Sequence, residues 1–182
     1  MRRLILGNKD ISTSLILNGE YVNVPFREPI TINYLIAAAG GGGGSGEDQL
    51  LAYRPGGGGG GAGGIITGST DLLTLNPYNV VIGTGGDGGR KGASAAGKNG
   101  GDSTFIELTA IGGGGGGNGQ GGSVPECTRI DGRDGGSGGG TGAHPFYTAC
   151  ATGSALQPNS TDGGFGNDGF AYGDGSAFSG GG

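Results

Sequence analysis

The sequence contains no tryptophan, one methionine and one histidine, and only 32% of its 182 residues are hydrophobic. So few apolar side chains cannot build a large hydrophobic core. A membrane-spanning helix is not expected either, because the longest apolar run, Tyr34–Ala39, falls far short of the ~20 residues required. Stability must therefore come from backbone hydrogen bonds between segments or from partner subunits.

Basic clusters are also missing from the chain. The formal net charge is −5 and the pI is about 4.6, whereas phosphate binding needs grouped lysine and arginine, so we expect no nucleic-acid partner. Proline totals 7 and the glycines run continuously, which excludes the every-third-residue pattern of collagen. Cys127 and Cys150 either form a disulfide or remain free thiols, and a count of two does not choose between them.

Catalytic and metal-binding patterns are absent or incomplete. His144 and the two cysteines lack the four closely spaced ligands of a zinc site. Gly83–Gly88 matches a dinucleotide-binding loop and Gly92–Asn99 nearly matches a phosphate-binding loop, but neither is followed by a helix signal. Gly163–Phe170 resembles one calcium-binding nonapeptide of a β-roll, which requires stacked copies. We therefore expect a protein that is not an enzyme, with no cofactor and no metal.

Glycine is what the sequence has in abundance: 52 of the 182 residues, about four times the ordinary share. Long glycine runs form either disordered linkers or polyglycine II, a left-handed helix with three residues per turn and no internal hydrogen bonds. Such helices can pack side by side and hydrogen-bond to one another, because no side chain separates their backbones. The runs are Gly40–Gly46, Gly56–Gly64, Gly112–Gly122, Gly135–Gly142 and Ser179–Gly182.

Apolar pieces between these runs favour the packed arrangement, because disordered chains lack such pieces. They are Gln49–Tyr53, Leu72–Leu75, Asn79–Ile82 and Thr104–Ile111. We predict that residues 40–182 form a bundle of polyglycine II helices with connecting loops, of which Ser123–Asp134 and Ala143–Asp162 are the longest. The glycines expected to be structurally required are Gly42, Gly59, Gly86, Gly115 and Gly138.

Residues 1–39 read as a small β segment for attachment or oligomerisation. Asn18-Gly19 is a strong two-residue hairpin signal, and further strands are expected at Val80–Ile82 and Thr104–Ile111. The predicted fold is mostly β and irregular, with essentially no α-helix. The predicted N-terminal strands are Arg3–Leu6, Ile11–Leu17, Glu20–Val24 and Ile30–Ala39.

The order of these pieces over Ile30–Gly122 resembles the glycine-rich domain of bacteriophage tail-fibre and other virion proteins. Tyr34–Gly44 enters a glycine run from a strand, and Gly57–Gly64 continues it. Leu73–Gly89 and Asn99–Gly117 follow the next two motifs of that family in the same order. A weaker likeness reaches the glycine-rich extracellular region of anaplastic lymphoma kinase-type receptors.

The resemblance implies a polyglycine II bundle on a virion whose loops contact a host receptor, a polysaccharide or an outer-membrane protein. It implies synthesis in the host cytoplasm, attachment to other virion proteins through residues 1–39, a homotrimer as one arrangement, and no membrane insertion. The alternative function is a purely structural virion component in a capsid, fibre or tail. The receptor-contact candidates are Tyr53, Arg54, Arg129, Arg133, His144, Phe146 and Tyr147.

Overall fold

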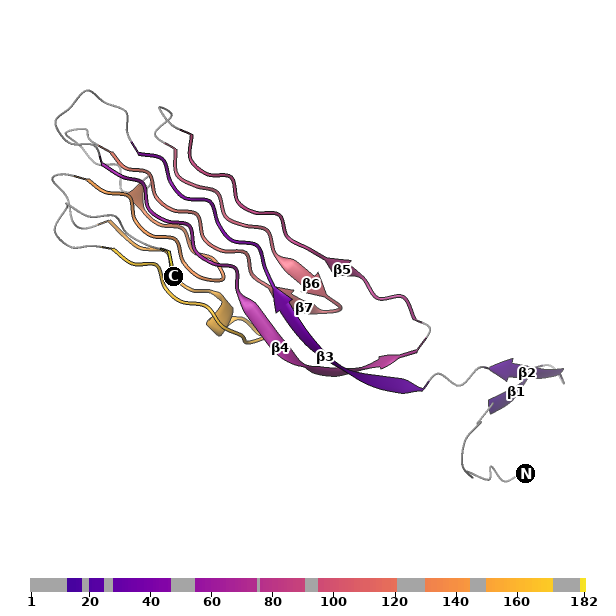
Figure 1. Ribbon diagram of the computed structural model, residues 1–182. Coiled ribbons are helices and arrows are strands. Elements are labelled where there is room, and N and C mark those ends of the chain that lie inside the picture. Colours follow the sequence, from indigo (N-terminus) through magenta and orange to yellow (C-terminus); the bar gives the residue numbers. More distant parts are fainter. Residues whose placement is uncertain are drawn as a thin grey trace. The chain divides into compact units, whose positions relative to one another are not determined.

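A computed structural model describes residues 13–17, 20–24, 28–46, 55–74, 76–90, 95–120, 130–144, 150–171 and 181–182, with backbone alone for 13–17 and 20–24. Its elements are short strands in three small sheets and one 3-10 helix, and none of these described elements is an α-helix (Figure 1). This agrees with the predicted fold class. The elements are β1 (Thr13–Leu17), β2 (Glu20–Val24), β3 (Pro29–Ala37), β4 (Ile65–Leu73), β5 (Val80–Val81), β6 (Ser103–Phe105), β7 (Leu108–Ala110) and η1 (Gln157–Asn159).

The chain divides into two compact units, 1–33 with 69–77 and 34–68 with 78–182. In the first unit, β1 and β2 pair antiparallel with Leu17 opposite Glu20. The hairpin predicted across Asn18-Gly19 is therefore confirmed. In the same unit the Thr31 hydroxyl donates to Asp71 over 2.6 Å. The predicted strand Arg3–Leu6 lies outside the described residues.

Strand β3 pairs with β4, a strand that the sequence did not reveal. The signal was hidden because a glycine, Gly68, interrupts the apolar pattern of β4. That glycine has a packing reason: a Cβ there would come within 3.0 Å of the Tyr34 side chain. On β3, exposed residues alternate with more buried ones from Thr31 onward. The most buried residue of the strand is Ile36, which is 8% exposed.

The expectation of one continuous strand over Thr104–Ile111 is wrong. Residues 103–110 form an antiparallel hairpin, β6 and β7, in which Phe105 lies opposite Leu108. The turn falls on Ile106 and Glu107, which carry none of the usual glycine, asparagine or proline signals. Ile106 instead takes a positive φ of 58°, an uncommon conformation for a β-branched residue.

We expect Ile106→Asn to stabilise the chain by about 1 kcal/mol, because asparagine tolerates the left-handed region far better than a β-branched residue. Ile106 is 43% exposed, so little packing is lost. Thermal unfolding of the variant measures the effect, and Ile106→Val, which keeps the β-branch, is the control. An unchanged or lower melting temperature for the asparagine variant would show that the turn is not strained.

The hydrophobic core is very small and lies within the second unit. Ile36, Ile66 and Ala110 form its buried centre, and Tyr34, Ala38, Phe105 and Leu108 pack against them. These residues come from β3, β4 and the β6–β7 hairpin. This apolar cluster therefore lies at the strand-bearing end of the unit.

Elsewhere in the second unit, most of the described residues form extended segments that run side by side, and most of these segments are rich in glycine (Figure 1). They are named here in chain order among the described residues: A (38–46), B (55–64), C (83–90), D (95–102), E (111–120), F (130–134), G (135–144), H (150–155) and I (165–171).

Hydrogen bonding between the segments repeats every three residues. Gly41 and Gly44 of segment A donate to carbonyls of segment B at 2.9 and 2.8 Å, whereas Gly42 and Ser45 donate to segment D at 2.9 and 3.0 Å. Adjacent residues thus donate to different neighbouring segments, and residues three apart donate to the same segment. This is the three-fold symmetry of polyglycine II, and it confirms the predicted bundle.

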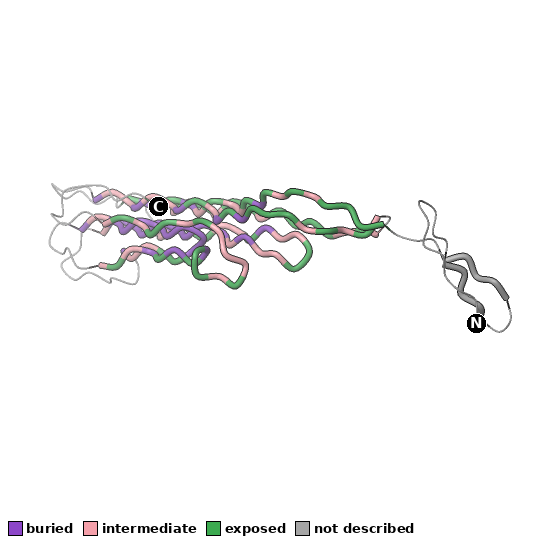
Figure 2. The backbone as a smooth tube through the Cα atoms, turned by 90° about the horizontal axis from the view of Figure 1, so that it is seen from below, coloured by how far each residue is buried: buried purple, intermediate pink, exposed green. Residues whose placement is uncertain are grey.

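Segment E is the centre of the lattice. Every residue from 112 to 119 is buried, as is every residue from 135 to 142 in segment G. Figure 2 shows buried stretches, in purple, inside the bundle. Segment E exchanges backbone hydrogen bonds with A, B, D, F and G. On segment B, by contrast, burial recurs only at Pro55, Gly58, Gly61 and Gly64. The three-residue period of burial distinguishes these segments from β-strands, whose period is two.

Part of each long predicted loop belongs to the bundle, which corrects their boundaries. Residues 130–134 of the first are segment F, where the Arg133 N–H donates to Gly115 at 2.9 Å. Residues 150–155 of the second are segment H, where the Gly153 N–H donates to Gly139 at 2.9 Å. Both segments contain few glycines, and this hid them from a reading based on glycine runs.

Candidate functional site

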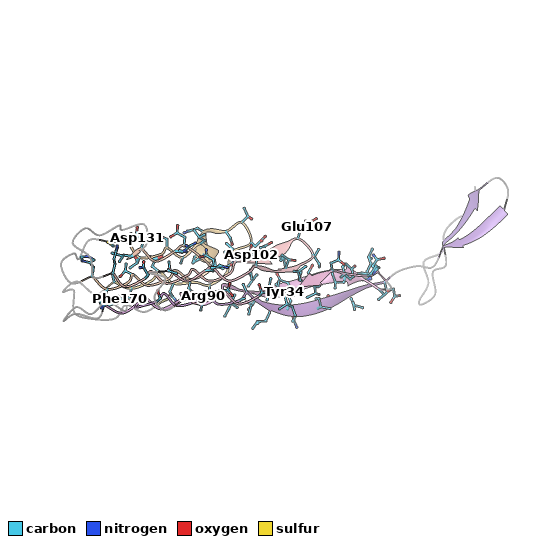
Figure 3. All side chains as sticks on the ribbon, turned by 90° about the horizontal axis from the view of Figure 1, so that it is seen from above. Tyr34, Arg90, Asp102, Glu107, Asp131 and Phe170 are labelled. Carbon is cyan, nitrogen blue, oxygen red and sulfur yellow. The ribbon has the colours of Figure 1, made fainter. Side chains whose placement is uncertain are left out.

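One end of the bundle collects the long connections of the chain. Segments A, C, E, G and I run toward this end, and B, D, F and H run away from it, as the constant offsets of their hydrogen bonds show. The segments therefore enter or leave this end at residues 46, 55, 90, 95, 120, 130, 144, 150 and 171. We call it the loop end. Figure 3 shows Asp131 and Phe170 nearer to it than Tyr34 and Glu107.

Four connections join the segments at the loop end, and all of their residues lie outside the described part of the chain. They are residues 47–54, 91–94, 121–129 and 145–149. The sequence places five of the seven receptor-contact candidates in them: Tyr53, Arg54, Arg129, Phe146 and Tyr147. At the opposite end the connections are built from β3, β4, the β6–β7 hairpin, a direct F–G junction and η1.

The other two contact candidates fall elsewhere. His144, the last residue of segment G, is only 2% exposed, so its side chain has no surface to offer a receptor. Arg133 is exposed on segment F, and its N–H and C=O bind Gly115 and Gly139 within the bundle. It therefore lies along the bundle rather than at the loop end. We carry neither residue forward as a receptor contact.

The predicted structural glycines lie where segments approach most closely. A Cβ at Gly42, Gly86, Gly115 or Gly138 would come within 3.0 Å of backbone atoms of a neighbouring segment. Gly59 accepts a hydrogen bond of 2.9 Å from the Gly140 N–H. Cys150 is disulfide-bonded, and the only other cysteine in the sequence, Cys127, lies outside the described residues.

An ion pair lies on the bundle surface, between segments C and D. Lys98 Nζ lies 2.8 Å from Asp87 Oδ2, and both side chains are more than two-thirds exposed. The hydrogen bond from Lys98, followed by its charge, lowers the pKa of Asp87 below its ordinary value of 3.8. The ionised carboxylate of Asp87 therefore stabilises the folded chain at pH values above 3.8. This contribution to folding stability is lost as the pH falls through the lowered pKa of the folded state.

We expect Asp87→Asn to shift the melting temperature by less than about 2 °C at pH 7, because exposed ion pairs contribute little. The variant and the parent should also lose stability alike between pH 7 and pH 5, where Asp87 stays ionised in both the folded and unfolded chains. Thermal unfolding across this range provides the check. A large shift at pH 7 that high salt abolished would assign this pair a structural role.

At the end opposite the loops, the buried side-chain amide of Gln157 hydrogen-bonds to three other residues. The sequence did not predict this role. Gln157 is fully buried; its Oε1 accepts from the Ile111 N–H at 2.7 Å. Its Nε2 donates to the Gly163 carbonyl at 2.6 Å and to the Ser160 hydroxyl at 3.0 Å. A lone glutamine beside a proline carries no sequence signal that predicts such a role.

Other site types find no support in the part of the chain that the structure describes. No group of three or more histidine, cysteine or acidic side chains is placed to hold a metal ion among those residues. Within the same residues, no helix is long and apolar enough to cross a membrane. Gly83–Gly88, the match to a dinucleotide-binding loop, belongs to segment C, and no helix follows it in the described residues 89–90 and 95–102.

Comparison with known proteins gives one family. No curated protein matches the chain significantly, and neither does any solved structure. The family model described as "glycine-rich domain" matches residues 16–182, which includes the whole of the second unit and the first unit from residue 16 onward. The chain therefore belongs to the glycine-rich domain family.

Proposed function

We propose that this chain is a non-enzymatic virion protein of the phage tail-fibre type, and that the connections at its loop end bind a receptor on the host surface. The observation that carries the proposal is that connections of four to nine residues gather at one end of a hydrogen-bonded lattice. Loops held by a rigid scaffold are common binding sites. The opposite end is closed by hairpins and a 3-10 turn.

The composition of these connections suits recognition of a saccharide or an outer-membrane protein. They contain Tyr53, Arg54, Arg129, Phe146 and Tyr147, and aromatic and arginine side chains dominate binding hot spots. The resemblance of the motif order to virion proteins supports a place on a phage particle. Residues 1–39 would then attach the chain to another virion protein.

A purely structural role is the second candidate. It is favoured by exposed apolar side chains on the second unit, where Leu35 is 69%, Val80 65% and Ile82 81% exposed. Large apolar side chains on a surface often mark contacts with another protein. In this role the chain would stabilise a fibre, tail or capsid, and its loop end would bind no receptor.

Loop replacement in the phage that carries the protein separates the two functions. Residues 47–54, 121–126 and 145–149 are each replaced by a short glycine-serine linker, which keeps Cys127, and Arg129 is replaced by alanine. We expect particles that assemble normally but lose adsorption to host cells. The matched control places the same linker at the Ile106–Glu107 turn, at the opposite end, and should leave adsorption intact.

Two results would overturn the receptor proposal. Particles with the replaced loops that still adsorb at the parental rate would remove the loop end as the binding site. Particles that fail to assemble, while the purified variant still folds, would support the structural role instead.

A further inference from the structure

Glycine packing alone does not fix how the segments align. Segment E contains six consecutive glycines, 112–117, and a polyglycine II helix repeats every three residues. Sliding a neighbour along it by three residues restores most backbone hydrogen bonds and places glycine against glycine. Residues other than glycine must therefore determine the observed register between neighbouring segments.

Two side chains of segment D bind segment E at that same three-residue spacing. Asp102 Oδ1 accepts from the Gly112 N–H at 2.7 Å, and Asn99 Oδ1 accepts from the Gly115 N–H at 2.9 Å. Asn99 Nδ2 also donates to the Asp134 carbonyl at 2.8 Å, which ties segment D to segment F. Each side chain thus supplies an acceptor where the neighbouring backbone supplies none.

The pattern recurs between segments F and H. Asp131 Oδ1 accepts from the Ala151 N–H at 2.7 Å, and Asp134 Oδ1 accepts from the Ser154 N–H at 2.6 Å. Segments F and H run parallel, whereas D and E run antiparallel. Acceptor side chains three residues apart can therefore bind a neighbouring segment in either the parallel or the antiparallel orientation, because the three-residue repeat does not depend on chain direction.

We propose that these two pairs, Asn99 with Asp102 and Asp131 with Asp134, fix the register of the bundle. The sequence around the first pair shows how. If segment D slid by three residues in one direction, Ala96 would face the Gly115 N–H; in the other direction, Phe105 would face the Gly112 N–H. Neither side chain can accept a hydrogen bond, so either slip leaves a buried N–H without a partner.

Register decides where the connections leave the lattice. A three-residue slip displaces one segment by roughly 9 Å along its neighbour, at ~3.1 Å per residue. Connection 91–94 begins at segment C and ends at segment D, so a slip of D alone would move one end of it by that distance. The pairs therefore position the connections at the loop end, whatever those connections bind.

Substitutions at Asp102 in the isotope-labelled full chain test the proposal. Asp102→Asn keeps the acceptor and Asp102→Ala removes it. For the alanine variant, and more strongly for Asn99→Ala with Asp102→Ala, we expect the Gly112 amide to exchange about tenfold faster or more. We also expect a second set of cross-segment NMR contacts, in which Gly97 approaches Gly113 instead of Gly116. The asparagine variant should show the parental contacts alone.

The control is Asp87→Ala, because this aspartate lies on segment C and its carboxylate binds the exposed side chain of Lys98. It should show one set of contacts and parental exchange. If the double variant does not fold, Asp102→Ala alone decides. The proposal is overturned if that variant loses stability but keeps a single set of Gly97–Gly116 contacts, or if Asp102→Asn slips as the alanine variant does.

Discussion

Gly115→Ala is expected to lower the free energy of unfolding by about 3 kcal/mol, whereas Gly85→Ala is expected to leave it unchanged or raise it slightly. The two substitutions add the same methyl group. At Gly115, in the centre of the lattice, the new Cβ would come within 3.0 Å of backbone atoms of Gly97 and Lys98. Backbone atoms cannot turn aside as a flexible side chain can, so segment D must shift.

Gly85 offers the opposite situation. Nothing lies within 4 Å of a Cβ built at this position, and its φ is outside the left-handed region. Alanine there reduces the freedom of the unfolded chain without a clash, which typically stabilises by a few tenths to 1 kcal/mol. Thermal unfolding of both variants should therefore differ by roughly 6–12 °C. Equal melting temperatures would contradict the close packing of segment E.

Gln157→Met should destabilise the chain by about 3 kcal/mol, although methionine has nearly the same size and shape. The substitution leaves the Ile111 N–H and the Gly163 carbonyl without the amide that binds them at 2.7 and 2.6 Å. Both contacts are screened from water, because Gln157 is fully buried. A Cβ at Gly64 or Gly164 would approach this side chain closely, so the cavity is shaped around it.

Denaturant unfolding of Gln157→Met measures this loss, with Asn159→Ala as the control on the same 3-10 turn. Asn159 is exposed and its amide makes one long hydrogen bond of 3.4 Å, so the control should unfold like the parent. Amide exchange should also accelerate at Ile111 before it does at segment A. A methionine variant as stable as the parent would show that packing, not the amide, holds this end.

The bundle itself could be predicted from sequence because glycine runs have few ordered structures open to them. The glycine runs at residues 40–46, 56–64, 112–122 and 135–142 correspond to segments A, B, E and G of the lattice. Segments F and H could not be found this way. Their backbones bond to segments E and G, and the carboxylates of Asp131 and Asp134 bind F to H, a role that depends on a neighbour twenty residues away.

The strands illustrate the same limit. The β1–β2 hairpin carries a local signal in Asn18-Gly19 and was predicted correctly. The turn at Ile106 has no such signal, because its conformation is imposed by pairing of Phe105 with Leu108. A reading of local propensity therefore joined β6 and β7 into one strand.

For the candidate site, residue types alone could not separate surface from interior. His144 reads as a loop residue beside a proline, yet it is buried at the end of segment G. The gathering of four connections at one end follows from the directions of the segments, and these are set by hydrogen bonds between residues far apart in sequence. A spacing of three between asparagine and aspartate, next to glycine, is a signal that could have been used.

The scarcity of buried apolar side chains has a thermodynamic consequence. The heat-capacity change of unfolding rises with exposed apolar area and falls with exposed polar area. Here the described part of the chain buries only five apolar residues, and two of those are alanines. The lattice instead buries peptide groups. Its heat-capacity change should therefore lie below the usual ~12–15 cal/mol/K per residue, which gives a flat stability curve and a chain that resists cold as well as heat.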